Sequence, residues 1–205
     1  REIRLCTAIA NASANSLYNA FLHEKIKNEK LQFEKLAITD YLTGLFNVRY
    51  FYHRIDEEIS RAQRYKFHLS CLMVDIDHFK KINDKYGHRT GDIVLTEFAR
   101  LLKKHTRKSD VLARYGGEEF IVLLPQTSPE AAVSKAETIK NFIKKHRFRG
   151  IKDKNGLTVS IGISSFPGRA IKNKEDIITA ADNALYKAKS TGRNRVVFLN
   201  GKMQN

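Results

Sequence analysis

Apolar residues recur along this chain at two alternating kinds of spacing. Apolar side chains three, four or seven residues apart predict helices with one buried face, whereas short continuous or alternating apolar runs predict strands. From Arg49 to the end of the chain the two patterns follow one another, and two strand patterns are adjacent in the middle. This order predicts a mixed α/β (α+β) domain with a central sheet flanked by helices.

The boundaries of these elements follow from turn and capping residues. Phe51, Ile55, Ile59 and Ala62 mark one face of the first helix after Arg49. Gly87 is predicted to end a second helix, and Ser128-Pro129 to begin a fourth. The helices after the first are predicted at 79–86, 90–105, 128–143 and 174–189. Strands are predicted at His68–Ile76, at the paired arms V-L-A-R-Y and F-I-V-L-L, at 157–164 and at 196–199.

The N-terminal part of the chain has a different pattern. Residues 9–39 contain neither Gly nor Pro and predict one long helix. Leu22, Ile26, Phe33 and Ala37 are spaced as in a coiled coil, although a helix docked on its own domain fits this short pattern equally well. We therefore expect a signalling or coiled-coil helix at 1–37, a globular domain at 38–200 and a tail at 201–205.

Composition narrows the class of protein. The 205 residues include 37 basic and 22 acidic side chains, and a net charge of +15 favours anionic partners such as nucleotides, nucleic acid or an acidic membrane. A lysine-rich solvated surface is the plainer explanation of this charge.

Cys6 and Cys71 form no metal-binding or disulfide pattern, which favours a location in the cytoplasm. No apolar run is long enough to span a membrane, and a chain that starts at Arg1 is expected to be a fragment.

The segment Arg114–Phe120, R-Y-G-G-E-E-F, carries the clearest chemical signal. Two glycines allow a tight turn and a close approach of the backbone to a ligand, and Glu118 and Glu119 follow directly. Taken alone, the segment also fits an ordinary hairpin turn with two solvated acids. The strand ending V-D-I-D adds Asp75 and Asp77, which we expect on one side of the sheet near those glutamates.

Four converging carboxylates favour a cation, and oxygen ligands favour Mg²⁺, with Mn²⁺ as the other possibility. Such ions usually complete their shell with substrate phosphates. Lys187, Lys189 and Arg193 near the end of the chain are candidate phosphate ligands, unless they serve only to complement the dipole at a helix end.

Five motifs in order resemble the GGDEF family of diguanylate cyclases. They are D-Y-L-T-G-L-F-N from Asp40, V-D-I-D-H-F-K-K-I-N-D-K-Y-G-H-R-T-G-D from Val74, the glycine turn itself, S-I-G-I-S from Ser160 and A-D-N-A-L-Y-K-A-K-S-T-G-R-N from Ala181. The resemblance implies a fold similar to nucleotidyl cyclase and polymerase palm domains. It also implies condensation of two GTP molecules into cyclic di-GMP with release of two pyrophosphates.

The resemblance assigns roles to individual positions. Asp75, the Ile76 carbonyl and Glu118 match metal ligands, and Glu119 matches an acid that binds metal and activates the 3′-hydroxyl. Residues matching the substrate site are Asn83 and Asp92 at the guanine edge, His88 beside the ligand, Phe79 and Lys80 where the turn wraps the phosphates, and Lys189 and Arg193 on the phosphates. We expect Asp92 to set the preference for GTP over ATP, because a carboxylate can accept from guanine N1–H and N2–H₂ together.

Two further expectations concern assembly and control. One family domain binds one GTP, so two must face each other, and the N-terminal helix, which faintly resembles the end of a GAF-type sensor, is expected to pair two copies as a homodimer. Arg107 and Asp110 form an R-x-x-D at the position of the family's inhibitory product site. The alternative function is a non-catalytic module that binds GTP or cyclic di-GMP; a nucleic-acid partner has no motif to support it.

Overall fold

The computed structural model describes residues 18–19, 21–27, 29, 37–152, 156–168 and 171–199. The chain divides into two compact units, Arg1–Ile38 and Thr39–Asn205. In the first unit residues 18–19, 21–27, 29 and 37–38 are helical, as the predicted N-terminal helix requires. Ile9 and Phe33, which belong to that prediction, lie outside the described residues, and Thr39 has already left the helix to form a β-bridge with Phe46.

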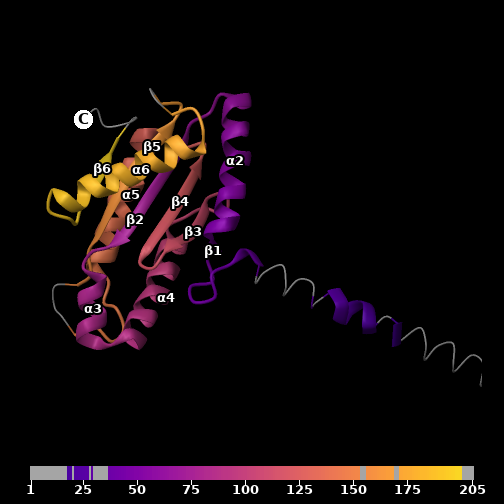
Figure 1. Ribbon diagram of the computed structural model, residues 1–205, viewed down its shortest axis with the longest axis horizontal. Coiled ribbons are helices and arrows are strands. Elements are labelled where there is room, and N and C mark those ends of the chain that lie inside the picture. Colours follow the sequence, from indigo (N-terminus) through magenta and orange to yellow (C-terminus); the bar gives the residue numbers. More distant parts are fainter. Residues whose placement is uncertain are drawn as a thin grey trace, which may run out of the picture. The chain divides into compact units, whose positions relative to one another are not determined.

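The second unit is built on a six-stranded mixed sheet (Figure 1). Its strands, in spatial order, are β1 (Phe46–Asn47), β3 (Val111–Gly116), β4 (Glu119–Pro125), β2 (Leu69–Ile76), β5 (Val159–Phe166) and β6 (Val196–Phe198). The two outermost pairs are parallel, and the inner pairs are antiparallel. β2 lies between β4 and β5, so its carboxyl end is enclosed on both sides.

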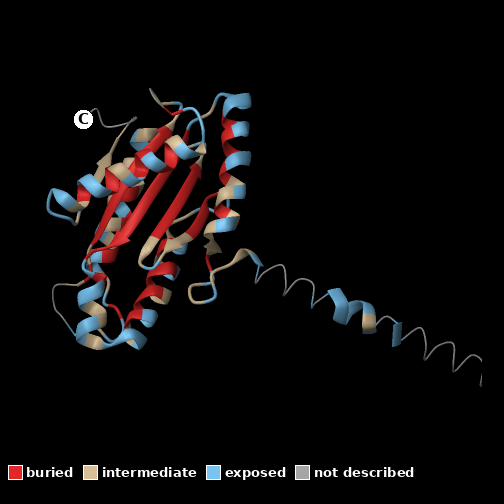
Figure 2. Cartoon of the chain, in the orientation of Figure 1, coloured by how far each residue is buried: buried red, intermediate tan, exposed pale blue. Residues whose placement is uncertain are grey.

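Helices cover both faces of this sheet, and Figure 2 shows the central strands β2, β4 and β5 buried along most of their length. The helices are α2 (Val48–Tyr65), α3 (Phe79–Tyr86), α4 (His88–Lys104), α5 (Pro129–Lys145) and α6 (Lys174–Ser190). Side chains of α4 and α5 pack with Leu72, Val74 and Ile76 of β2, whereas those of α2 and α6 pack with Leu69, Cys71 and Met73. Alternate residues of one strand thus serve two cores.

The predicted mixed sheet flanked by helices is confirmed, and several boundaries change. β5 begins and ends two residues later than predicted. It continues past Ser164 because the polar Ser165 is buried there and its hydroxyl pairs with that of Ser70. α4 begins at His88, not Thr90, directly after Gly87 (φ 82°) ends α3. The sequence pattern missed β1, which is only two residues long.

The capping prediction for α5 is confirmed. The Ser128 side chain accepts a hydrogen bond from the Ala131 backbone N–H, and Pro129 occupies the first turn. Among the described residues, no helix is long and apolar enough to cross a membrane.

Candidate active site

The glycine turn joins β3 to β4 and brings its second glutamate beside β2. Glu119 is the first residue of β4 and is paired with Asp75 across the antiparallel ladder. A register shift between Arg114 and Gly116 gives the β3 side an irregularity before the turn. Two nitrogen atoms of the Arg114 guanidinium donate to the Gly117 carbonyl, at 2.7 and 3.1 Å, and so hold the turn closed.

Arg114 is itself held by a residue whose role the sequence reasoning missed. Its Nη1 lies 3.3 Å from both carboxylate oxygens of Asp40. Asp40 also accepts from the Thr43 backbone N–H and hydroxyl, at 2.9 and 2.7 Å. Burial alone would raise the pKa of Asp40, but the hydrogen bonds from Thr43 and the charge of Arg114 outweigh it and lower that pKa. The first motif of the chain therefore braces the glycine turn.

The acids at the end of β2 and on the turn gather around one lysine. Lys189 of α6 places its Nζ 2.7 Å from Asp75 Oδ2 and 4.0 Å from Glu119 Oε1. Burial raises the pKa of Asp75 to about 6; Lys189 opposes the rise, and Glu118 and Glu119 add to it. Burial also raises the pKa of Glu118. Three carboxylates thus compete for the positive charge of Lys189.

Asp77 does not join this cluster, so the expectation of four converging acids was wrong. β2 ends at Ile76, and the alternation of its side chains no longer applies one residue later. The buried Asp77 carboxylate instead accepts from the hydroxyls of Thr158 and Ser160 and from the Asn194 backbone N–H. Its hydrogen bonds organise the surrounding backbone.

The residues predicted for the guanine edge and for the turn around the phosphates lie on α3 and α4, at the end of the sheet where β2 terminates (Figure 1). The predicted phosphate ligands Lys189 and Arg193 lie in the last turn of α6 and shortly after it. Phe79 is buried at the start of α3, and Lys80 beside it is exposed. The Asn83 side-chain oxygen is buried without a hydrogen-bond partner in the described part of the chain and lies against Gly91, where a methyl group would collide with it. Asp92 and His88 are exposed on α4, and Arg193 is exposed after α6.

A cavity of about 360 Å³ adjoins Asp92. Its lining includes Leu42, Thr96 and two arginines, Arg100 and Arg149. The structure thus brings Asp75, Glu118, Glu119 and Lys189 together directly. Asn83 and Asp92 come from two neighbouring helices, α3 and α4, and no contact in the described part of the chain joins them to this cluster.

Arg107 and Asp110 lie in the connection between α4 and β3, away from the acid cluster in sequence. The buried Asp110 carboxylate accepts from the Arg107 backbone N–H at 2.8 Å and pairs with Lys135 of α5 at 2.9 Å. Two cavities, of about 350 and 260 Å³, are both lined by Arg107 and Asp110. Lys135 has no local sequence motif that marks it as part of this region.

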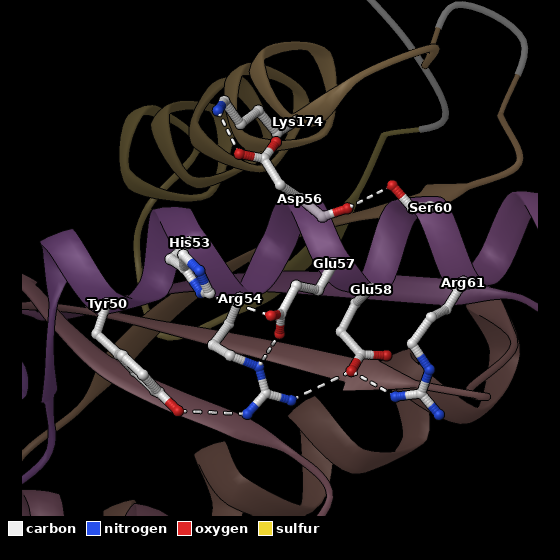
Figure 3. A network of polar contacts seen from close by, with 9 residues as sticks. All are labelled: Tyr50, His53, Arg54, Asp56, Glu57, Glu58, Ser60, Arg61 and Lys174. Carbon is white, nitrogen blue, oxygen red and sulfur yellow. Dashed lines mark hydrogen bonds and ion pairs between the residues drawn. The ribbon is translucent and has the colours of Figure 1, made fainter.

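The smaller of these cavities is also lined by charged side chains of α2. Figure 3 shows Arg54 and Arg61 converging on Glu58, whose Oε1 lies 3.2 and 2.8 Å from their nitrogen atoms. Glu58 is buried, so its negative charge fixes two arginines at the cavity wall. Only the folded chain brings these α2 residues close to Arg107.

The family model for "Diguanylate cyclase, GGDEF domain" matches residues 37–195. Diguanylate cyclase A of Treponema denticola is 44% identical over 170 residues, which are 82% of this chain and 46% of that protein. Diguanylate cyclase DgcM of Escherichia coli is 40% identical over 189 residues, 89% of this chain and 44% of that protein. The chain spans a little under half the length of these two relatives.

Solved structures resemble the fold closely. The coiled coil and GGDEF domain of DgcB from Caulobacter crescentus, in complex with c-di-GMP, matches with a TM-score of 0.81 and 29% identity, covering 91% of this chain and 98% of that one. The active GGEEF domain of a diguanylate cyclase from Vibrio cholerae matches with a TM-score of 0.70 and 37% identity, covering 74% and 96%.

Proposed function

This chain belongs to the GGDEF family of diguanylate cyclases, and on that premise we propose that it condenses two GTP molecules into cyclic di-GMP. The observation that carries the proposal is the cluster of Asp75, Glu118 and Glu119 around Lys189. Each of two reactions joins a 3′-oxygen to an α-phosphorus, breaks the bond to pyrophosphate and releases the hydroxyl proton. Such a reaction needs concentrated positive charge at the phosphates and a base near the hydroxyl.

The acid cluster has the donor chemistry for a divalent cation. Its side-chain ligands are all oxygen atoms, and the raised pKa of Asp75 marks a buried acid whose negative charge is incompletely compensated. Asp75, Glu118, Glu119 and the Ile76 carbonyl would hold Mg²⁺ or Mn²⁺. Such an ion would lower the pKa of the attacking 3′-hydroxyl and neutralise negative charge on the phosphates. In the part of the chain that the structure describes, these carboxylates are not arranged as a ready-made metal site. Substrate phosphates would complete the shell of the ion, as is usual for Mg²⁺ in proteins.

The remaining roles fall to residues around this cluster. Glu119, at the start of β4, accepts the proton of the 3′-hydroxyl. Lys189 and Arg193 hold the phosphates, and the turn at Phe79 and Lys80 wraps them. Asn83 and Asp92 read the guanine edge, with His88 beside the ligand. Support for the guanine roles comes from the packing of Asn83 against Gly91, one residue before Asp92.

We further propose that the active centre forms between two copies. One set of acids with one nucleotide site supplies half of what a two-substrate condensation needs. The N-terminal helix would pair the copies, and the similar DgcB structure consists of a coiled coil with its GGDEF domain.

Cyclic di-GMP would inhibit the reaction by binding at Arg107 and Asp110, a proposal supported by the cavities beside them. A cytoplasmic location would supply the GTP.

Replacement of Glu119 tests the reaction. Glu119→Gln keeps the shape of the side chain but removes the charge and the base, so we expect turnover of GTP with Mg²⁺ to fall about 100-fold or more. Glu130→Gln, an exposed glutamate of α5, is the matched control and should leave turnover unchanged. A chelator should stop the wild-type reaction. Full activity of the Glu119 variant would refute its role, whereas nucleotide binding without any product in the wild type would favour a binding module.

A further inference from the structure

Asp77 is a buried carboxylate that no step of the proposed reaction uses. It lies two residues after Asp75 and is 5% exposed. Its Oδ1 accepts from the Ser160 hydroxyl at 2.7 Å, and its Oδ2 accepts from the Thr158 hydroxyl at 2.7 Å and the Asn194 backbone N–H at 3.0 Å. With both oxygens occupied by protein donors, Asp77 is better suited to holding backbone than to binding a ligand.

The third donor belongs to a turn with an unfavourable backbone. Arg193 (φ 59°) and Asn194 (φ 48°) are consecutive residues in the left-handed region, which residues other than glycine rarely adopt. The Asn194 side-chain oxygen is buried and has no partner within the described residues. The ends of the turn are fastened by backbone bonds from Arg193 N–H to Ala188 and from Ile161 N–H to Arg195. Asp77 fastens its middle.

This contact joins two parts of the proposed active site. Asp75, a member of the acid cluster, precedes Asp77 by two residues. The Asp77 carboxylate accepts from the turn that contains Arg193. The same turn directly follows α6, whose last turn provides Lys189. The distance between the acids and the phosphate-binding side chains therefore depends on how firmly this turn is tied to the end of β2.

We propose that Asp77 is a positioning residue: it ties the turn at Arg193 to the end of β2 and so sets where the nucleotide phosphates bind. This inference rests on the proposed function, because it assigns Arg193 to phosphate. It predicts that loss of Asp77 acts through Arg193. A purely structural role would weaken the fold without any dependence on Arg193.

The test measures equilibrium binding of 3′-deoxy-GTP with Mg²⁺, since this analogue lacks the attacking hydroxyl and cannot condense. We expect Arg193→Ala to weaken binding about tenfold, Asp77→Ala to weaken it by a similar factor, and the double variant to bind no more weakly than Arg193→Ala. Asp77→Asn should bind within about threefold of wild type, because its oxygen can keep the Asn194 and Thr158 bonds while its NH₂ donates to Ser160. Ser160→Ala, which leaves the Asn194 bond intact, is the matched control and should bind normally.

Independent, multiplying effects of Asp77→Ala and Arg193→Ala would overturn the proposal, as would normal binding by Asp77→Ala. If Asp77→Ala does not fold, amide hydrogen exchange of the wild type decides: the Asn194 N–H should be protected, and unprotected exchange would contradict the tie. Wild-type protein that binds 3′-deoxy-GTP but makes no product from GTP would refute the proposed reaction and leave this inference standing.

Discussion

At the scale of single residues, Asp75 shows the cost of building a charged site inside a fold. Burial raises its pKa to about 6, and Glu118 and Glu119 add to the rise, although Lys189 lies 2.7 Å away. The ionised carboxylate is therefore less favourable in the folded protein than in the unfolded chain at neutral pH. Active sites often retain such destabilising charges because the ligand needs them.

Because the ionised Asp75 carboxylate destabilises the folded state, replacement of Asp75 by a neutral residue should stabilise the protein. Between pH values of about 3.8 and 6 the folded state retains a proton on Asp75 that the unfolded chain has released, so the free energy of unfolding falls as pH rises through this window. Asp75→Asn removes the effect. After a discount for residual solvent exposure we expect a gain of about 1 kcal/mol at pH 7, or roughly 2–4 °C in Tm.

Thermal unfolding in the presence of a chelator measures this gain. The difference in Tm between Asp75→Asn and wild type should shrink as pH falls from 7 to 4, because the wild-type carboxyl becomes protonated there. Asp84→Asn, which removes an exposed acid of α3, is the control. A variant that is less stable than wild type at pH 7 would show that the pair with Lys189 outweighs burial.

At the scale of elements, hydrophobic periodicity predicted most of the helices and strands, because their apolar faces are continuous in sequence. It failed at the end of β5, where the buried Ser165 pairs with Ser70, and at β1, which is too short to carry a pattern. In the site, local motifs identified Asp75 and the two glutamates. They could not reveal that Arg114 is held by Asp40, since that contact joins residues 74 positions apart.

The proposed product site is also assembled from several elements. Arg107 comes from the connection after α4, and the smaller of its two cavities is also lined by α2. Asp110 is held by Lys135 of α5. An arginine suits this place because its planar guanidinium can stack on guanine and donate to phosphate. We expect Arg107→Ala to raise the concentration of cyclic di-GMP needed for half-inhibition about tenfold or more and to leave the initial rate unchanged.

Product-inhibition curves check this prediction. Lys145 is an exposed residue at the end of α5 and lies outside the two cavities. Lys145→Ala removes the same unit of charge as Arg107→Ala, and cyclic di-GMP should inhibit this variant as it inhibits the wild type. Unchanged inhibition in Arg107→Ala would remove the regulatory role. A parallel loss in both variants would attribute inhibition to the general positive charge of the protein.

At the scale of the whole molecule, the globular unit holds one acid cluster and, in our proposal, one nucleotide site. A condensation of two GTP molecules needs both in duplicate, so the rate per chain should depend on encounter between chains. The helical residues of the N-terminal unit include exposed Tyr18, Phe21 and Ile26, apolar side chains of the kind that a second copy would cover.

Mass spectrometry of the products formed from GTP and Mg²⁺, across a series of protein concentrations, tests the central claim most directly. We predict cyclic di-GMP and pyrophosphate in a ratio of one to two, with initial rate per chain rising with protein concentration until dimers are saturated. ATP in place of GTP should give no cyclic dinucleotide if Asp92 selects guanine. Absence of cyclic di-GMP at every concentration, with the protein folded and GTP bound, would contradict the assignment of this chain as an active cyclase.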